Sequence, residues 1–120
     1  MNNLQANQLI TSLYSAVDNK DLSYLDTALA ENVNFRIGNF NTITDKQSAL
    51  DANKQFFDSI SSMKHSIDKV WSAGKDVICS GAVDYVRLDG SKHCAFFSTQ
   101  LTLVGGKITD YFVYADISEL

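Results

Sequence analysis

The chain has 120 residues and a mass of 13.3 kDa, close to the commonest size of one domain, so we expect a single domain over residues 1–120. Hydrophobic residues make up 45% and charged residues 20%, which argues against disorder, and no apolar run approaches the roughly 20 residues that span a bilayer. The net charge of −4 argues against nucleic acid and anionic membranes as partners. The polar start of the sequence lacks the apolar core of a secretory signal, so we expect a soluble, cytoplasmic protein.

The sequence indicates neither a metal site nor a disulfide framework. Its two cysteines, Cys79 and Cys94, and its two histidines are scattered without the spacing that metal ligands require. We therefore expect no metal and no other cofactor.

The first part of the chain has helical periodicity. Apolar residues recur on one side between Leu9 and Val17, which predicts an amphipathic helix of about four turns. Asp21 is placed to cap a short second helix over residues 22–29. A strand follows, because apolar and polar residues alternate from Val33 to Gly38. Residues 44–47 then form a capping box that opens a third helix, with one side predicted to carry Ala49, Asn53, Phe56, Ile60 and Met63.

The second half changes from helical spacing to the alternation typical of strands. Three glycine-containing turns, at residues 73–76, 88–91 and 104–107, each predict a hairpin with a two-residue loop. They join four strands, which we expect at residues 63–73, 76–88, 91–104 and 107–117. Strands of this length twist and coil, so the sheet is expected to curve around the helices.

Both faces of this sheet carry apolar side chains, although three helices can cover only one of them. The face expected to meet the helices includes Phe97, Leu101, Phe112 and Tyr114. The opposite face is expected to present Tyr85, Phe96, Tyr111 and Val113. An uncovered apolar face predicts a homodimer that forms through the outer side of the sheet.

Several short motifs occur in a characteristic order along nearly the whole chain. They are Tyr14, Asp21-Leu22, Phe35-Arg36-Ile37-Gly38-Asn39, His65, Trp71, Tyr85-Val86-Arg87-Leu88-Asp89-Gly90 and Tyr114-Ala115-Asp116. Together with helices that precede a bent meander, they resemble the nuclear transport factor 2-like superfamily, and in detail its SnoaL-like branch. The resemblance implies an α+β, cone-shaped fold, with three N-terminal helices packed on a strongly curved, mainly antiparallel sheet. The superfamily includes isomerases, epoxide hydrolases, polyketide cyclases, dehydratases and non-catalytic binding proteins, so the fold does not settle the function.

Two activities of the superfamily can be compared with this chain residue by residue. Tyr14 matches the position of an oxyanion-hole tyrosine in ketosteroid isomerases, but their base would fall at about Arg36 and their protonated aspartate at about Thr99. The Asp-Arg-Asp arrangement of limonene-epoxide hydrolases matches only Asp84, because the other two positions lack the required residues. Neither activity is therefore expected.

The three predicted turns also place residues opposite one another across the sheet. With two-residue loops, His65 lies opposite Asp84, Asp84 opposite Ala95, and Ala95 opposite Asp116. We expect His65 and Asp84 to hydrogen bond, because directly opposed Cβ atoms lie about 4.5–5.5 Å apart. Such a pair is suited to proton transfer near neutral pH, since the carboxylate orients the imidazole. A purely structural ion pair between the same residues is the alternative.

These residues lead to two functional hypotheses. The first is a cofactor-independent enzyme of the polyketide cyclase, isomerase or dehydratase kind, acting on a small apolar carbonyl compound with His65, Asp84 and Tyr14 as catalytic residues. The second is a non-catalytic domain that binds a small hydrophobic molecule in the same pocket. In either case the expected ligand-binding residues are Phe35, Phe56, Trp71, Phe97, Thr99, Leu101, Phe112, Tyr114 and Asp116.

Overall fold

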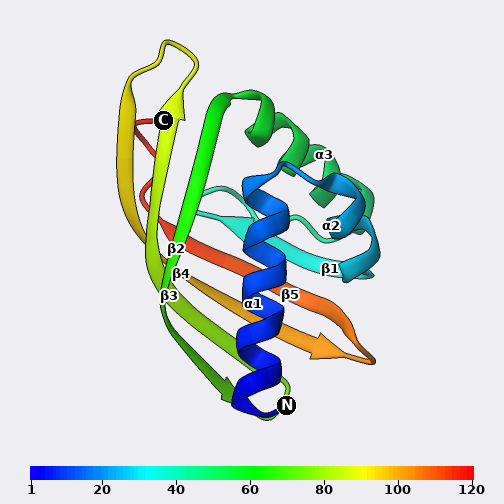
Figure 1. Ribbon diagram of the computed structural model, residues 1–120. Helices are drawn as coiled ribbons and strands as arrows, with labels where there is room; N and C mark the ends of the chain where they lie inside the picture. The colour runs from blue at the N-terminus through cyan, green and yellow to red at the C-terminus, as the bar shows by residue number, and fades with distance from the viewer.

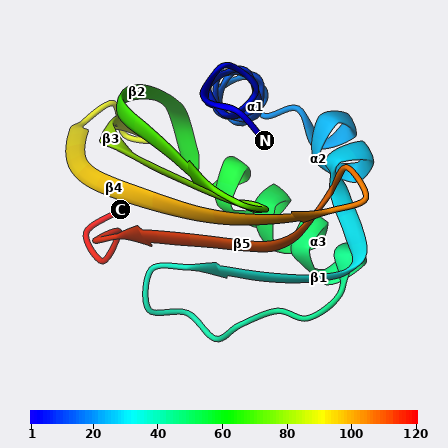
Figure 2. The ribbon, with the colours of Figure 1, turned by 90° about the horizontal axis from the view of Figure 1, so that it is seen from below.

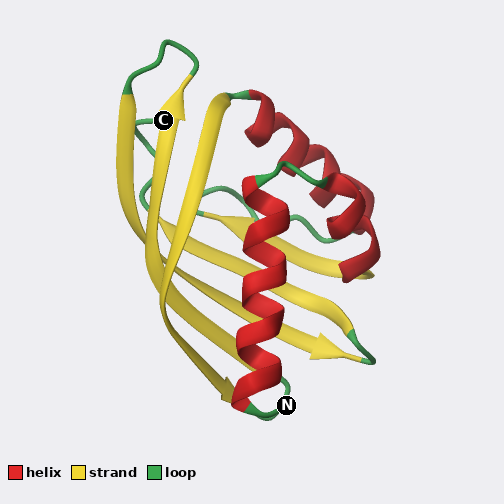
Figure 3. Ribbon diagram, in the orientation of Figure 1, coloured by secondary structure: helices red, strands yellow, loops and turns green.

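The computed structural model describes all 120 residues and contains three helices and five strands (Figure 1, Figure 3). In chain order these are α1 (Asn3–Asp18), α2 (Leu22–Ala28), β1 (Leu29–Ile37), α3 (Lys46–Asp58), β2 (Ile60–Ala73), β3 (Asp76–Arg87), β4 (Lys92–Val104) and β5 (Lys107–Ala115). The expected α+β, cone-shaped fold is confirmed, because the helices lie on the concave side of a strongly curved, unclosed sheet (Figure 2). None of the helices has the length and apolar character needed to cross a membrane.

Each helix begins at a polar side chain that accepts a backbone hydrogen bond from the first turn. These caps are Asn2 for α1, Asp21 for α2 and Asp45 for α3. Asp21 is the predicted cap, and Asp45 lies within the predicted capping box. The third helix is shorter than expected: Ile60 and Met63, assigned to it on spacing alone, lie in β2 instead.

The strands lie in the order β1-β5-β4-β3-β2, so β2 to β5 form a meander and β1 joins it beside β5. The meander is antiparallel, whereas β1 runs parallel to β5. α1 packs along β2, and α3 packs against β1 and β2 (Figure 1). The helices and the concave face of the sheet enclose one hydrophobic core of 22 buried residues, among them Ile10, Leu13, Val33, Val83 and Leu101.

The β3–β4 hairpin has a three-residue loop, not the predicted two-residue loop. Arg87 and Ser91 close this loop with a backbone hydrogen bond, and Gly90 adopts the left-handed conformation at φ 87°. The longer loop shifts the pairing of the two strands by one residue. Asp84 consequently lies opposite Cys94, and the predicted pairing of Asp84 with Ala95 is wrong.

Bulges shift the other two hairpins, although their turns are the two-residue loops that the sequence predicts. In β2, Asp68 is an extra residue without a partner on β3, so His65 lies opposite Val83. In β5, Thr109 is the extra residue, and the pairing beyond it moves by one. The predicted polar row across the four strands therefore does not form.

Because alternate residues of a strand face opposite sides, these shifts move several side chains to the other face. Tyr85, Tyr111 and Val113, expected on the outer face, are buried against the helices. Phe112 and Tyr114, expected toward the helices, lie on the outer face, where Tyr114 is 45% exposed. The prediction for Phe96 is confirmed, since this residue is 86% exposed.

Both edge strands have some of their free backbone groups covered. At β2, the Asp18 carboxylate accepts a hydrogen bond from the His65 backbone N–H at 3.0 Å. The Lys20 ammonium donates to two carbonyls at the start of the same strand, at 2.8 and 3.2 Å. At the opposite edge, Phe35 of β1 exchanges two backbone hydrogen bonds with Ile43 in the following loop. The end of α1 and this loop thus shield parts of the two sheet edges.

Candidate functional site

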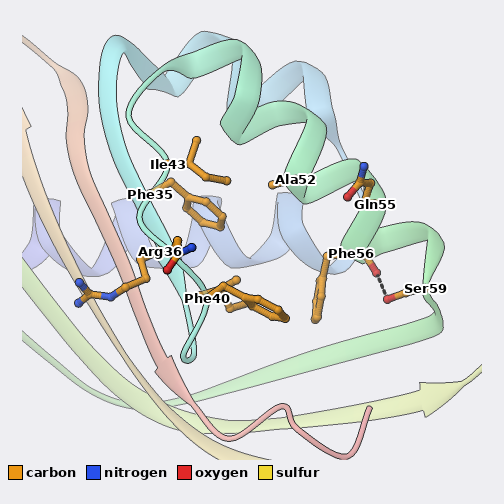
Figure 4. Close-up of a pocket in the computed structure, with 10 residues that line it drawn as sticks. Phe35, Arg36, Phe40, Ile43, Ala52, Gln55, Phe56 and Ser59 are labelled. Atoms are coloured by element: carbon orange, nitrogen blue, oxygen red, sulfur yellow. Dashed lines mark hydrogen bonds between the residues drawn. The ribbon is translucent and has the colours of Figure 1, made fainter.

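An apolar pocket of about 350 Å³ lies between β1, the loop that follows it and α3 (Figure 4). Its walls are Phe35, Arg36, Ile37, Phe40, Asn41, Ile43, Ala52, Gln55, Phe56 and Ser59. Two of the predicted ligand-binding residues, Phe35 and Phe56, are among them. Phe40 and Ile43 were not predicted as pocket residues, although they stand out as apolar residues in an otherwise polar loop.

The periodicity of α3 explains how one helix serves both the core and the pocket. Ala49, Asn53 and Phe57 recur at every fourth position and are buried in the core. Ala52 and Phe56, also four residues apart, form the neighbouring stripe and line the pocket. The sequence predicted one apolar side for this helix, and the structure has two adjacent ones.

Phenyl rings from three segments gather at the pocket (Figure 4). Phe35 comes from β1 and is 3% exposed, which makes it a fixed wall. Phe56 comes from α3, and its ring meets Tyr85 edge-on at a centroid distance of 6.0 Å. Phe40 comes from the loop and is 64% exposed, so it is a wall residue of which much is still open to solvent.

The pocket has no side chain suited to acid–base chemistry. Arg36 is the only charged residue among its walls, and its guanidinium extends away from the phenyl rings (Figure 4). On the outer face it donates to the Tyr114 hydroxyl at 2.9 Å and lies 4.6 Å from the Phe112 ring centroid. No three His, Cys, Asp or Glu side chains of the protein come close enough together to hold a metal ion. The arrangement favours binding of an uncharged molecule.

The predicted hydrogen bond between His65 and Asp84 does not exist, because the bulge at Asp68 pairs His65 with Val83 and so places the His65 and Asp84 side chains on opposite faces of the sheet. His65 faces α1, and its Nδ1 lies 2.6 Å from the Asp18 carboxylate. Asp84 is exposed on the outer face beside Cys94, where its carboxylate raises the pKa of the Cys94 thiol above the ordinary value.

Tyr14 approaches His65 from α1, as predicted, with ring centroids 4.3 Å apart. Its hydroxyl hydrogen bonds to that of Thr99, so the position that the resemblance connects with an oxyanion-hole tyrosine contacts the position that it connects with a protonated aspartate. Both residues are buried, and burial raises the pKa of Tyr14 well above its usual range. Neither residue lines the apolar pocket.

The other predicted ligand-binding residues lie away from this pocket. Phe97 and Leu101 are buried in the hydrophobic core. Trp71, expected as a pocket wall, is 50% exposed on the outer face opposite Ile78. Asp116 is exposed just beyond β5 and accepts a hydrogen bond from the Ser118 hydroxyl at 2.6 Å.

No family model and no curated protein matches the chain, but many solved structures have the same fold. A nuclear transport factor 2-like protein of unknown function from Burkholderia pseudomallei has 17% identity and a TM-score of 0.85, over 99% of this chain and 95% of its own.

Two further similar structures carry functional descriptions. A Jannaschia protein provisionally described as a SnoaL-like polyketide cyclase has 12% identity and a TM-score of 0.83, over 96% of this chain and 88% of its own. An LEH-like epoxide hydrolase from Mycobacterium tuberculosis has 15% identity and a TM-score of 0.81, over 97% of this chain and 86% of its own. Identities this low establish the fold and leave the activity open. The chain therefore has the nuclear transport factor 2-like fold that the SnoaL-like proteins share.

Proposed function

We propose that the protein binds a small, uncharged, largely apolar molecule in the pocket between β1 and α3. The observation that carries this proposal is a cavity of about 350 Å³ with phenyl rings from three segments and no charged group directed into it. Cavities of roughly 300–1,000 Å³ with mostly apolar walls are typical of small-molecule sites. A ligand that covers the exposed Phe40 ring would gain binding free energy, because it removes apolar area from water.

The charges around the pocket determine the class of ligand. Since the Arg36 guanidinium is held on the outer face by Tyr114, a ligand carboxylate would be buried without a partner, which is costly. Asn41 and Gln55 line the pocket with side-chain amides that form no hydrogen bond within the protein. They can meet one or two neutral polar groups of the ligand. This favours neutral aromatic compounds over organic acids.

Binding without chemistry is favoured in this pocket over polyketide cyclase, isomerase or dehydratase activity. Those reactions require a group that moves a proton within reach of the substrate. The predicted catalytic residues Tyr14, His65 and Asp84 are all absent from the walls of the pocket.

The proposal can be tested by titrating the protein with N-phenyl-1-naphthylamine, a neutral probe that becomes fluorescent in apolar surroundings. We expect saturable fluorescence that Ala52→Phe abolishes by filling the pocket. Phe56→Ala should weaken binding about tenfold, the effect of losing most of one buried apolar contact. The matched control is Phe96→Ala, which removes the same ring from the outer face and should leave binding unchanged. Unaltered binding by Ala52→Phe would refute the proposal.

The outer sheet face supports a second proposal, a homodimer that forms through this face. No helix covers it (Figure 2), and it carries three large exposed side chains. Phe96 is 86% exposed, Trp71 50% and Tyr114 45%. A stable specific interface buries at least about 1,000 Å² in total, and pairing two such faces would remove these rings from water.

A further inference from the structure

We propose that the protein has a second site, an acid–base centre at His65 in the cleft between α1 and β2, with Asp18 as its positioning residue. The cleft has a volume of about 520 Å³ and shares no residue with the apolar pocket. The α1 side of its wall is mainly polar, and β2 supplies the remaining residues, which include Met63, Lys64 and Ile67.

Asp18 fixes the orientation of the His65 ring. Its carboxylate accepts hydrogen bonds from His65 Nδ1–H at 2.6 Å and from the His65 backbone N–H at 3.0 Å. Two aromatic rings hold the imidazole from the sides, Tyr14 at 4.3 Å and Phe97 edge-on at 5.1 Å. The His65 side chain is only 7% exposed, so the ring has little freedom to turn. With the proton on Nδ1, the lone pair of the neutral ring lies on Nε2.

The Nε2 atom of His65 is unpartnered and is not fully excluded from solvent. It takes part in none of the hydrogen bonds of the protein. The only solvent-excluded side-chain nitrogen or oxygen atom without a partner is His93 Nε2, so His65 Nε2 has contact with solvent. An imidazole that a carboxylate orients through one nitrogen, and that leaves the other nitrogen free, is the arrangement used by general bases.

Lys64 adds a positive charge to the same cleft. Because β2 is an edge strand, Lys64 lines the cleft together with His65, although its side chain leaves the strand on the outer face, opposite Asp84. The Lys64 ammonium forms no ion pair within the protein. A base beside a free cation is suited to carbon acids, in which removal of a C–H proton develops negative charge on a nearby oxygen. We therefore assign the site to neutral carbon acids.

The ring-opening of 5-nitrobenzisoxazole tests this assignment directly. His65 Nε2 takes the proton from the ring carbon, and the C–H electron pair becomes part of a nitrile. The N–O bond breaks, its electrons stay on oxygen, and the coloured phenolate leaves beside Lys64. The imidazolium returns its proton to water, so the protein is regenerated without a co-reactant.

We expect the wild-type protein to accelerate this reaction, and His65→Gln to reduce the protein-dependent rate about a hundredfold. Lys64→Met should cause a smaller loss. His93→Gln is the matched control, because it replaces the other histidine, which lies outside the cleft, and should keep the wild-type rate. A His65→Gln variant that folds and keeps the wild-type rate would overturn the proposal, and so would a wild-type rate no higher than that of free imidazole.

The tautomer of His65 gives a second measurement, which does not require the His65→Gln variant to fold. Nitrogen NMR of the neutral imidazole should place the proton on Nδ1 in the wild type. Asp18→Asn can still accept the backbone N–H bond, but it lacks the carboxylate charge that stabilises the imidazolium formed in the reaction. We expect it to slow the reaction about tenfold or more while the protein stays folded. A proton on Nε2 in the wild type, or an unchanged rate in Asp18→Asn, would show that Asp18 only tethers α1 to the edge of the sheet.

Discussion

Replacing Gly81 with alanine is expected to destabilise the protein more than any other glycine-to-alanine change. Gly81 lies on β3 opposite Ile67, beside the bulge at Asp68. A Cβ atom added there would lie 2.1 Å from the Ser66 carbonyl oxygen and 3.1 Å from a ring carbon of Phe97. The oxygen belongs to the backbone of the neighbouring strand, so it cannot move away unless β2 separates from β3.

The expected cost is about 3 kcal/mol, the upper end of what overpacking a folded interior costs. For a chain of this length, that loss corresponds to a fall in melting temperature of about 10 °C. Urea unfolding followed by circular dichroism measures it, and an unchanged dependence on urea concentration would show that only stability has changed.

Gly74→Ala is the matched control. Gly74 has φ 61° but no atom within 4 Å of an added Cβ, so this change should cost only the local backbone strain of about 1 kcal/mol. If Gly81→Ala lowers the free energy of unfolding no more than Gly74→Ala does, then β2 and β3 do not approach as closely at the bulge as described. The register that places His65 opposite Val83 would then be wrong too.

Three further predictions concern other parts of the molecule. Burial, assisted by the charge of Asp18, raises the pKa of Tyr85 from 10.0 to about 12, and burial raises that of Cys79 from 9.0 to about 11. Because the unfolded chain loses these protons at lower pH than the folded protein, the free energy of unfolding should fall as pH rises from 9 to 12. In urea unfolding near pH 12, Tyr85→Phe should restore about 2 kcal/mol of that free energy. Lys20→Met keeps the aliphatic stem but removes two hydrogen bonds to β2, and should cost about 1 kcal/mol in the same assay. Phe96→Glu should convert the proposed homodimer to a monomer in sedimentation, whereas Asn7→Glu on α1 should not; a wild-type monomer of 13.3 kDa would contradict the dimer.

The helices and the number of strands could be predicted from the sequence because their signals are local. Apolar spacing and capping side chains act within a few residues, and tertiary packing reinforces them. The register could not be predicted, because the residue types around Asp68 give no sign that the strand contains a bulge there. The segment Leu88-Asp89-Gly90 suits both a two-residue and a three-residue hairpin loop, since each needs a residue with positive φ. Each one-residue error moved the side chains beyond it to the other face of the sheet.

The candidate sites were predictable to a different degree. Phe35 and Phe56 were identified because apolar residues at strand and helix spacing must face an interior. His65 was identified as a chemically significant residue, but its partner Asp18 lies 47 residues earlier, at the end of a helix. No periodicity within β2 indicates which helix end will meet it. Phe40 lies in an irregular loop, where the sequence carries no repeating pattern from which its direction could be read.

The covered edges of the sheet limit how the folded protein can associate. A strand from another molecule needs a row of free N–H and C=O groups to extend a sheet. At β2 that row is interrupted by Asp18 and Lys20, and at β1 by Ile43. Edge-to-edge growth into fibres is therefore opposed at both sides of the sheet, which leaves the broad outer face, the surface of the proposed homodimer, as the larger area open to association. A variant that lacks the Lys20 ammonium should accordingly aggregate sooner on prolonged incubation than the wild type, even where most of its molecules remain folded.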